Sequence, residues 1–186
     1  MPYPPAENSY DIFRDGGTTL EISALIDLVL TVRGFRARLD ERLRAINQSA
    51  ARMETLAAIA NMQGQVSQTD LARRLRVEGA TITRMIDVLS ADGLVERSPH
   101  PTDRRVNLLR VTEAGDAALR RIFLVYDMFR ADLLKGISQE EIAELHRITG
   151  LMLGRLDVMG GSEIRLEAPQ TVDRLRDPTA GAGGPD

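Results

Sequence analysis

Residues 67–112 contain two short helical patterns, a turn between them and two β-prone segments, an order that tightly restricts the fold of the chain. The first pattern begins at Ser67, whose hydroxyl can accept a hydrogen bond from the backbone N–H of Asp70 while the Asp70 carboxylate reaches back, as in a capping box. Leu71 and Leu75 follow on one face, because residues four apart are neighbours on a helix. These residues predict a short amphipathic helix.

A turn at residues 76–79 separates this helix from a second one. We expect Val77 to be the apolar plug of the turn and Gly79 its permissive backbone position, since glycine adopts positive φ without steric strain. The second helix carries an apolar stripe with helical spacing, which predicts a buried face. The stripe consists of Ile82, Met85, Ile86 and Leu89. The residues that face outward near its start are Ala80, Thr81, Thr83 and Arg84.

Two β-prone segments, residues 94–97 and 106–111, follow the second helix after a turn. Pro99 and Pro101 exclude a helix between the two segments, because proline lacks the backbone N–H that a helix interior needs. The connecting loop ends in Asp103, Arg104 and Arg105. This order of elements predicts a helix-turn-helix followed by a β-hairpin wing.

The outward-facing side chains of these elements suit duplex DNA. Small and hydroxyl side chains permit close approach to base edges, and Arg84 can donate two hydrogen bonds to guanine. An arginine on a narrow hairpin can enter a minor groove, where the potential of DNA is most negative. Each feature alone also occurs on inert surfaces, so the interpretation depends on their combination. The residues expected to contact DNA are Ser67, Gln68, Arg73, Arg74, Gly79, Ala80, Thr81, Thr83, Arg84, Asp103, Arg104 and Arg105.

Over roughly residues 20–157 the chain resembles the MarR family of winged helix-turn-helix transcriptional regulators. The resemblance rests on four segments, residues 71–75, 81–84, 92–97 and 103–115. It implies that Asp103 orients the wing electrostatically and that Arg105 reaches the minor groove. Two positions depart from the usual pattern: Val111 stands where Leu is usual, and Glu78-Gly79 stands where many members carry a polar cap and a proline.

Helical patterns also flank the winged segment. Residues 20–46 carry one apolar stripe, made of Leu25, Leu28, Val32, Phe35, Leu39 and Leu43. Further apolar residues make the first half of this helix apolar nearly all round, so it must be covered on more than one side. Residues 113–135 and 138–158 predict two more helices, and Ser138 to Glu141 reads as a capping box at the start of the second.

These three helices predict a two-fold dimer with a second copy of the chain, with a monomeric helical cap as the alternative. A dimer that holds two reading helices about 34 Å apart would contact successive major grooves, so the operator should be pseudo-palindromic. The fold class is therefore mainly α with a small β wing (α+β), in which N- and C-terminal dimerisation helices flank the winged helix-turn-helix.

The expected organisation places one domain between two tails. Neither end resembles a signal peptide, and no stretch approaches the roughly 20 apolar residues of a membrane span. We therefore expect a cytoplasmic, nucleoid-associated protein without membrane contact. The expected parts are a flexible arm over 1–18, a MarR-type domain over 19–158 (dimerisation helices 19–47 and 113–158, winged segment 48–112) and a disordered tail over 159–186.

Composition limits the chemistry of the chain. The formal net charge is −3, yet residues 67–110 hold eight Arg against six Asp or Glu, and local charge governs contact with phosphates. Cysteine is absent, which excludes disulfides and thiol sensing. His100 and His146 lack the neighbours of a zinc site, and no catalytic triad or phosphate loop is evident. We expect no metal, no cofactor and no enzymatic activity.

A small-molecule effector is the remaining route for regulation. The MarR resemblance implies aromatic carboxylates or related metabolites, including coenzyme A thioesters, bound between the dimer scaffold and the reading head. Candidate lining residues are Phe35, Arg36, Leu39, Arg52, Met53 and Leu56. The alternative is that the apolar members of this set are core and both arginines are solvated. A winged helix that binds another protein, without sequence-specific DNA binding, is the alternative for the whole chain.

Overall fold

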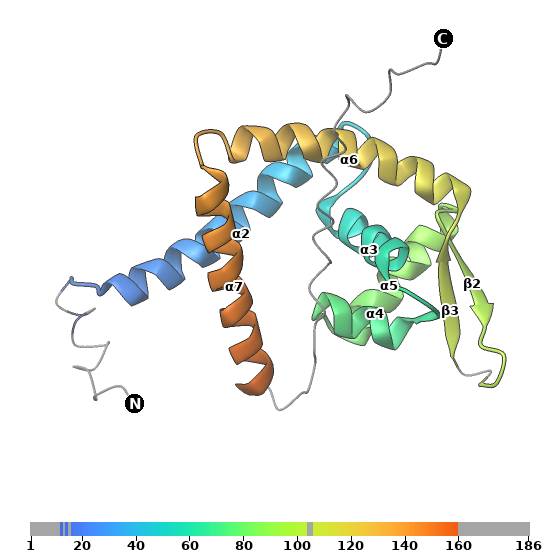
Figure 1. Cartoon of the computed structure of the whole chain (residues 1–186). Helices are drawn as coiled ribbons and strands as arrows, with labels where there is room; N and C mark the ends of the chain where they lie inside the picture. Colours follow the sequence, from blue (N-terminus) through green and yellow to red (C-terminus); the bar gives the residue numbers. More distant parts are fainter. Residues whose placement is uncertain (1–11, 13, 15, 104–105, 160–186) are drawn as a thin grey trace, which may run out of the picture. The chain divides into compact units, whose positions relative to one another are not determined.

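The computed structural model describes residues 12, 14, 16–103 and 106–159, and shows a mainly helical chain with a small antiparallel sheet (Figure 1). The predicted fold class is confirmed. Residues up to Gly136 form one compact unit, and α7 lies outside it in a second. The elements are α2 (Leu20–Arg44), α3 (Ala50–Asn61), β1 (Val66–Ser67), α4 (Gln68–Leu75), α5 (Gly79–Ala91), β2 (Val95–Pro99), β3 (Asn107–Val111), α6 (Glu113–Leu133) and α7 (Gln139–Met159).

Several sequence predictions fall on residues outside the described part of the chain. They are Arg104 and Arg105 of the predicted wing, residues 1–11, 13 and 15 of the N-terminal arm, and residues 160–186 of the tail. Within the described residues, no helix is both long and apolar enough to cross a membrane.

Helix α4 begins with the cap that the sequence predicts. The Ser67 hydroxyl accepts from the backbone N–H of Asp70 at 3.1 Å and donates to the Asp70 carboxylate at 2.6 Å. The carboxylate is thus held by the hydroxyl, whereas a capping box pairs it with the backbone N–H of the cap residue. Two backbone bonds close the other end of the helix, from Arg76 to Arg73 at 3.2 Å and from Val77 to Ala72 at 3.1 Å.

The turn between α4 and α5 differs from the prediction at two residues. The left-handed position is Arg76, with φ of 54°, in the place where a Schellman motif ends a helix. Gly79 is the first residue of α5 and is not among the residues with positive φ. Val77 is 41% exposed and therefore does not plug the turn. The residue with positive φ is the one that ends α4, Arg76, which lies three residues before the predicted Gly79.

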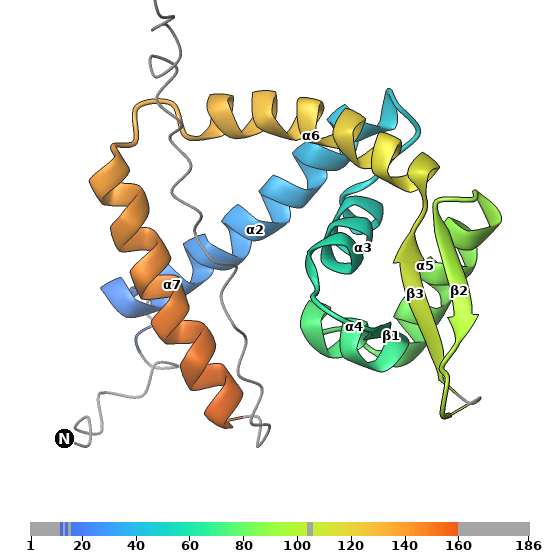
Figure 2. The ribbon, with the colours of Figure 1, turned by 45° about the vertical axis from the view of Figure 1, so that its right-hand side comes forward.

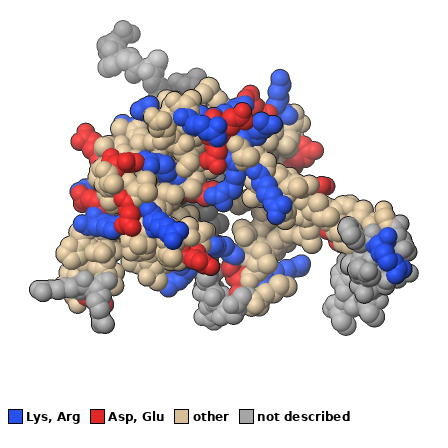
Figure 3. Space-filling view, turned by 180° about the vertical axis from the view of Figure 1, so that it is seen from behind, with Lys and Arg blue, Asp and Glu red and all other residues tan. Residues whose placement is uncertain are grey.

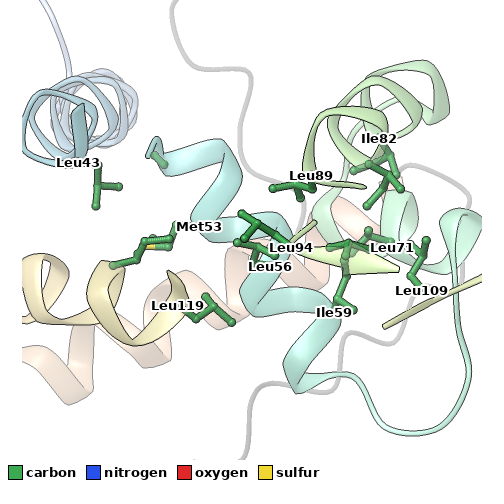
Figure 4. Close-up of a cluster of buried hydrophobic side chains, with 14 of the residues drawn as sticks. Leu43, Met53, Leu56, Ile59, Leu71, Ile82, Leu89, Leu94, Leu109 and Leu119 are labelled. Atoms are coloured by element: carbon green, nitrogen blue, oxygen red, sulfur yellow. The ribbon is translucent and has the colours of Figure 1, made fainter. Parts of the chain in front are cut away.

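The core of the winged segment lies between α3, α4, α5 and the sheet (Figure 4). The predicted stripe of α5 is turned inward: Ile82, Ile86 and Leu89 are at most 2% exposed, and Met85 packs against them half-buried. This core fixes which face of α5 is left outside. It also includes Leu56, Ile59, Leu71, Leu94 and Leu109.

The sheet has the strand order β1–β3–β2, with both pairs antiparallel. Val95 lies opposite Val111 and Pro99 opposite Asn107, so β2 and β3 form the predicted hairpin. The strand β1 was not predicted, because two residues carry no periodic signal and are a strand only through their pairing with β3. Near the tip, the backbone N–H of His100 donates to the carbonyl of Val106 at 2.9 Å.

Helix α2 is buried only in its C-terminal half. Leu39 and Leu43 are fully buried, and the ring centroids of Phe35 and of Phe129 in α6 are 5.2 Å apart. The C-terminal half of α2 thus runs beside α6 (Figure 2). In the single chain the N-terminal half is largely exposed, and its burial against a second copy stays a prediction. Five of its large apolar residues are 47–56% exposed, namely Leu25, Ile26, Val29, Leu30 and Val32.

Helix α7 begins with a complete capping box. The backbone N–H of Ser138 donates to the Glu141 carboxylate at 2.8 Å, and the Glu141 N–H donates to the Ser138 hydroxyl at 3.2 Å. Hydrogen bonds from the backbone N–H and from the hydroxyl of Ser138 hold the pKa of the Glu141 carboxyl below its ordinary value. No residue of α7 is buried, although the helix carries Leu145, Ile148, Leu151, Leu153 and Leu156.

Candidate DNA-binding surface

The outer face of α5 carries the side chains that the sequence singled out. Ala80, Thr81, Thr83 and Arg84 are all exposed, since the opposite face of the helix is held in the core. Gly79 is exposed as well, and a Cβ built on it would meet no atom within 4 Å. The start of α5 therefore presents small side chains together with hydroxyl groups and one guanidinium.

Arg84 differs from the neighbouring arginines because it has no hydrogen-bond or ion-pair partner among the described residues. Arg73 pairs with Asp70 at 3.1 Å, and Arg110 pairs with Glu96 at 2.7 Å. The guanidinium of Arg84 keeps all its N–H donors available, so it can bind a base edge or a phosphate without breaking an existing pair.

The two threonines of α5 use their hydroxyls differently. The Thr83 hydroxyl donates to the carbonyl of Gly79 at 3.0 Å, a bond within the same helix. The Thr81 hydroxyl has no hydrogen-bond partner in the described part of the chain. Thr81 can therefore donate or accept, whereas Thr83 has already used its only proton.

The candidate residues at α4 are less accessible to a ligand than those of α5. Ser67 and Gln68 are half-buried, and the Ser67 hydroxyl is held by the helix cap. Arg74 is half-buried, whereas Arg73 is exposed and paired with Asp70. An exposed pair of this kind contributes little to stability, typically below about 1 kcal/mol. Arg73 can therefore exchange its carboxylate for another anion at low cost.

The hairpin is tied to α5 by a pair that the sequence did not reveal. The Arg97 guanidinium of β2 donates to the Asp87 carboxylate of α5. The Arg110–Glu96 pair bridges β2 and β3 and lowers the pKa of the Glu96 carboxyl. Asp87 and Arg97 have no sequence signal in common, because strand register and helix phase bring them together.

At the tip of the hairpin the described residues form an ordered loop. Asp103 is half-buried, and its carbonyl accepts from the backbone N–H of Val106 at 3.0 Å. The Nδ1 atom of His100 accepts from the backbone N–H of Thr102 at 3.2 Å. A backbone bond thus joins Asp103 and Val106, the described residues on either side of the two undescribed arginines.

Comparison with known proteins adds an independent line of evidence to this geometry. A family model described as "MarR family" matches residues 49–106. The structure of the transcriptional regulator PA3341 is 33% identical, with 70% of this chain and 95% of that one covered and a TM-score of 0.63. The chain belongs to the MarR family. MarR from E. coli in its apo form is 28% identical over 71% of this MarR-family chain and 96% of its own, with a TM-score of 0.59.

A further structure shows a cysteine-to-serine mutant of E. coli MarR complexed with operator DNA. It is 27% identical, covers 72% of this MarR-family chain and 94% of its own, and has a TM-score of 0.62. The matched model segment, residues 49–106, contains α3, α4, α5 and β2, so it includes the candidate surface of α5.

The six candidate effector residues of this MarR-family chain are packed apolar side chains or paired arginines. Leu39 and Leu56 are fully buried and Met53 is 9% exposed, which agrees with the alternative that they are core. Phe35 is half-buried and packs its ring against Tyr126 and Phe129.

Both arginines of that set are paired with carboxylates. Arg36 binds Glu54 at 2.8 Å between α2 and α3, and burial raises the pKa of Glu54 although Arg36 lowers it. Arg52 binds Asp92 at 2.7 Å, and its side chain is only 16% exposed. An anionic ligand would have to displace a carboxylate from either arginine.

Charge on the surface is mixed. On the face seen in Figure 3, basic and acidic side chains lie interspersed and do not separate into one positive region. The overall formal charge of −3 agrees with this pattern. This face therefore offers no continuous positive region, and any attraction to phosphates there comes from individually placed arginines, since local charge decides the contact.

Proposed function

We propose that this MarR-family protein is a transcriptional regulator that binds duplex DNA sequence-specifically through α5 and the β2–β3 hairpin. The observation that carries the proposal is the unpaired guanidinium of Arg84, which lies on the exposed face of α5 beside small and hydroxyl side chains. The mutant E. coli MarR structure, which holds operator DNA, supports the same use of the fold. A helix of these dimensions fits the major groove of B-DNA.

The proposed contacts follow from the exposed face of α5 and from the ends of α4, and for the wing from the MarR resemblance. Arg84 donates to a guanine edge, and Gly79 with Ala80 lets the helix come close to the bases. Asp103 orients the wing, and the two arginines after it enter the minor groove. Residues at both ends of α4 bind the DNA backbone and fix the register; they are Ser67, Gln68, Arg73 and Arg74.

We also propose that the protein acts as a homodimer on a pseudo-palindromic operator. The exposed apolar halves of α2 and α7 support this, because a second copy would remove them from water. Helix α6 also carries apolar side chains that a second copy could cover, namely Phe123, Leu124 and Met128, which are 42–68% exposed. A two-fold dimer would place two copies of α5 about one helical turn of DNA apart.

The regulatory proposal is repression that is relieved by a small aromatic or aryl-CoA-like anion. It is supported by the MarR resemblance and by the two arginines near the junction of α2 and α3. Arg36 is the better candidate to hold the anion, since its pair with Glu54 is half-exposed and therefore weak. A regulator of this kind would act at the nucleoid.

A salt titration of the full-length protein with genomic and random DNA fragments tests the DNA proposal. We expect the logarithm of the affinity to fall steeply with the logarithm of the salt concentration, by about 0.9 for each phosphate neutralised. The absence of a steep dependence would support the alternative, a winged helix that binds another protein.

Replacement of Arg84 tests the specific contact. Arg84→Ala should lower the ratio of operator to random affinity, by about 1–3 kcal/mol for a lost guanine pair. Arg121→Ala removes another exposed and unpaired arginine, on α6, and is the matched control. If Arg84→Ala weakens operator and random DNA equally, Arg84 binds phosphate and the base-reading role is wrong.

A further inference from the structure

The hydroxyl of Thr83 is restricted in what it can offer to a ligand. It has one proton, which is donated to the carbonyl of Gly79 at 3.0 Å, and two lone pairs that remain. Thr83 is exposed, so these lone pairs and the methyl group are what the side chain presents outside the helix. On this face Thr83 is therefore a hydrogen-bond acceptor.

The space next to Thr83 is open. Side chains on a helix tilt toward its N-terminus and lie over the residue four positions earlier. That residue is Gly79, which has no side chain and no atom within 4 Å of where a Cβ would be. On the other side, the carboxylate of Asp87 is held by Arg97. Nothing described in the chain thus blocks the acceptor from a base edge.

Thr81 gives the contrast within the same helix. The residue four positions before it is Val77, which precedes the first residue of α5 and so belongs to the turn. The hydroxyl of Thr81 forms no hydrogen bond with the described residues and can rotate to donate or to accept. Thr81 therefore tolerates either kind of group on DNA, whereas Thr83 does not.

We propose that Thr83 selects a base with an exocyclic amino group, adenine or cytosine, at one position on one strand of each half-site. This inference rests on the proposed function. In the major groove adenine and cytosine present an amino donor, whereas guanine and thymine present a carbonyl oxygen at the corresponding place. A carbonyl would face the lone pairs of Thr83 unless the hydroxyl left Gly79. Loss of one such bond corresponds to a preference of roughly two- to tenfold.

The test uses the full-length protein and begins with selection of an operator from a random duplex library. Adenine is then replaced by purine, and cytosine by 2-pyrimidinone, one position at a time, which removes only the amino group. At one position of each half-site we expect this replacement to weaken wild-type binding by roughly two- to tenfold. Thr83→Val, which keeps the branched shape without the hydroxyl, should not respond to it.

Two further variants separate the inference from general damage. Thr83→Ser keeps the hydroxyl and should respond like the wild type. Thr81→Val should weaken binding without losing the response at that position. If Thr83→Val responds to every replacement as the wild type does, or if guanine or thymine is selected at the coupled position, the inference is wrong. If the wild type selects no operator at all, the proposed function is wrong and the inference about Thr83 is wrong with it.

Discussion

Gly115 offers the sharpest test of the packing between the wing and α6. It is the third residue of α6 and is buried, and its N–H donates to the Thr112 hydroxyl at 3.0 Å. A Cβ built on Gly115 would lie 2.7 Å from Cγ1 of Val111 and closer still to the carbonyl oxygen of Leu94. The Leu94 oxygen is itself fixed, because it accepts from the backbone N–H of Thr112 at 3.0 Å.

The size of the effect follows from which atoms collide. A flexible side chain could rotate away from a new methyl group, but the nearest atom here belongs to the backbone. Insertion of a methyl into a well-packed site typically costs 1–3 kcal/mol, so we expect Gly115→Ala to lower the free energy of unfolding by about 3 kcal/mol. For a chain of this size, that corresponds to a fall in Tm of about 6–12 °C.

Thermal and urea unfolding, followed by circular dichroism at one fixed protein concentration, measures this loss. Gly79→Ala is the matched control, since its new methyl meets nothing within 4 Å and φ is not positive. Alanine in a helix is favoured over glycine by about 1 kcal/mol, so the control should be unchanged or slightly more stable. A Gly115→Ala variant as stable as Gly79→Ala would refute the argument from close packing.

Two other predictions concern the scaffold. Burial raises the pKa of Glu54 above its ordinary 4.5, because the charged carboxylate is disfavoured in the folded state. The free energy of unfolding is therefore higher at pH values below 4.5, where Glu54 is protonated, and it falls as the pH rises through the pKa of the folded state. Glu54→Gln should therefore be at least as stable as the wild type at pH 7, and it should lack the stabilisation that the wild type gains on acidification. A Glu54→Gln variant that is less stable at pH 7 would show that the ion pair with Arg36 contributes more than burial of the carboxylate costs. Leu30 is 56% exposed on α2, and Leu30→Glu should shift a sedimentation profile from dimer to monomer, while an unchanged profile would place the dimer contact elsewhere.

The helix-turn-helix was predictable because its signals are local. The spacing of Ile82, Ile86 and Leu89 depends only on the helical period, and the Ser67 cap joins groups three residues apart. The outward face of α5 follows directly, since the faces of a helix are linked by its geometry. The exposure of Thr83 and Arg84 could thus be predicted without a structure.

The tertiary structure decided how those exposed groups are used. Asp87 lies three residues after Arg84 on α5, yet its carboxylate pairs with Arg97 of β2, and Arg84 has no partner among the described residues. Strand register and helix phase decide this pairing, which no local pattern records. The left-handed conformation of Arg76 likewise depends on where α4 ends, and so the glycine at position 79 misled the sequence interpretation. The sequence by itself determined which residues face outward, through periodicity. Contacts between distant segments determined which of them are free to bind, because hydrogen-bond partners depend on three-dimensional proximity.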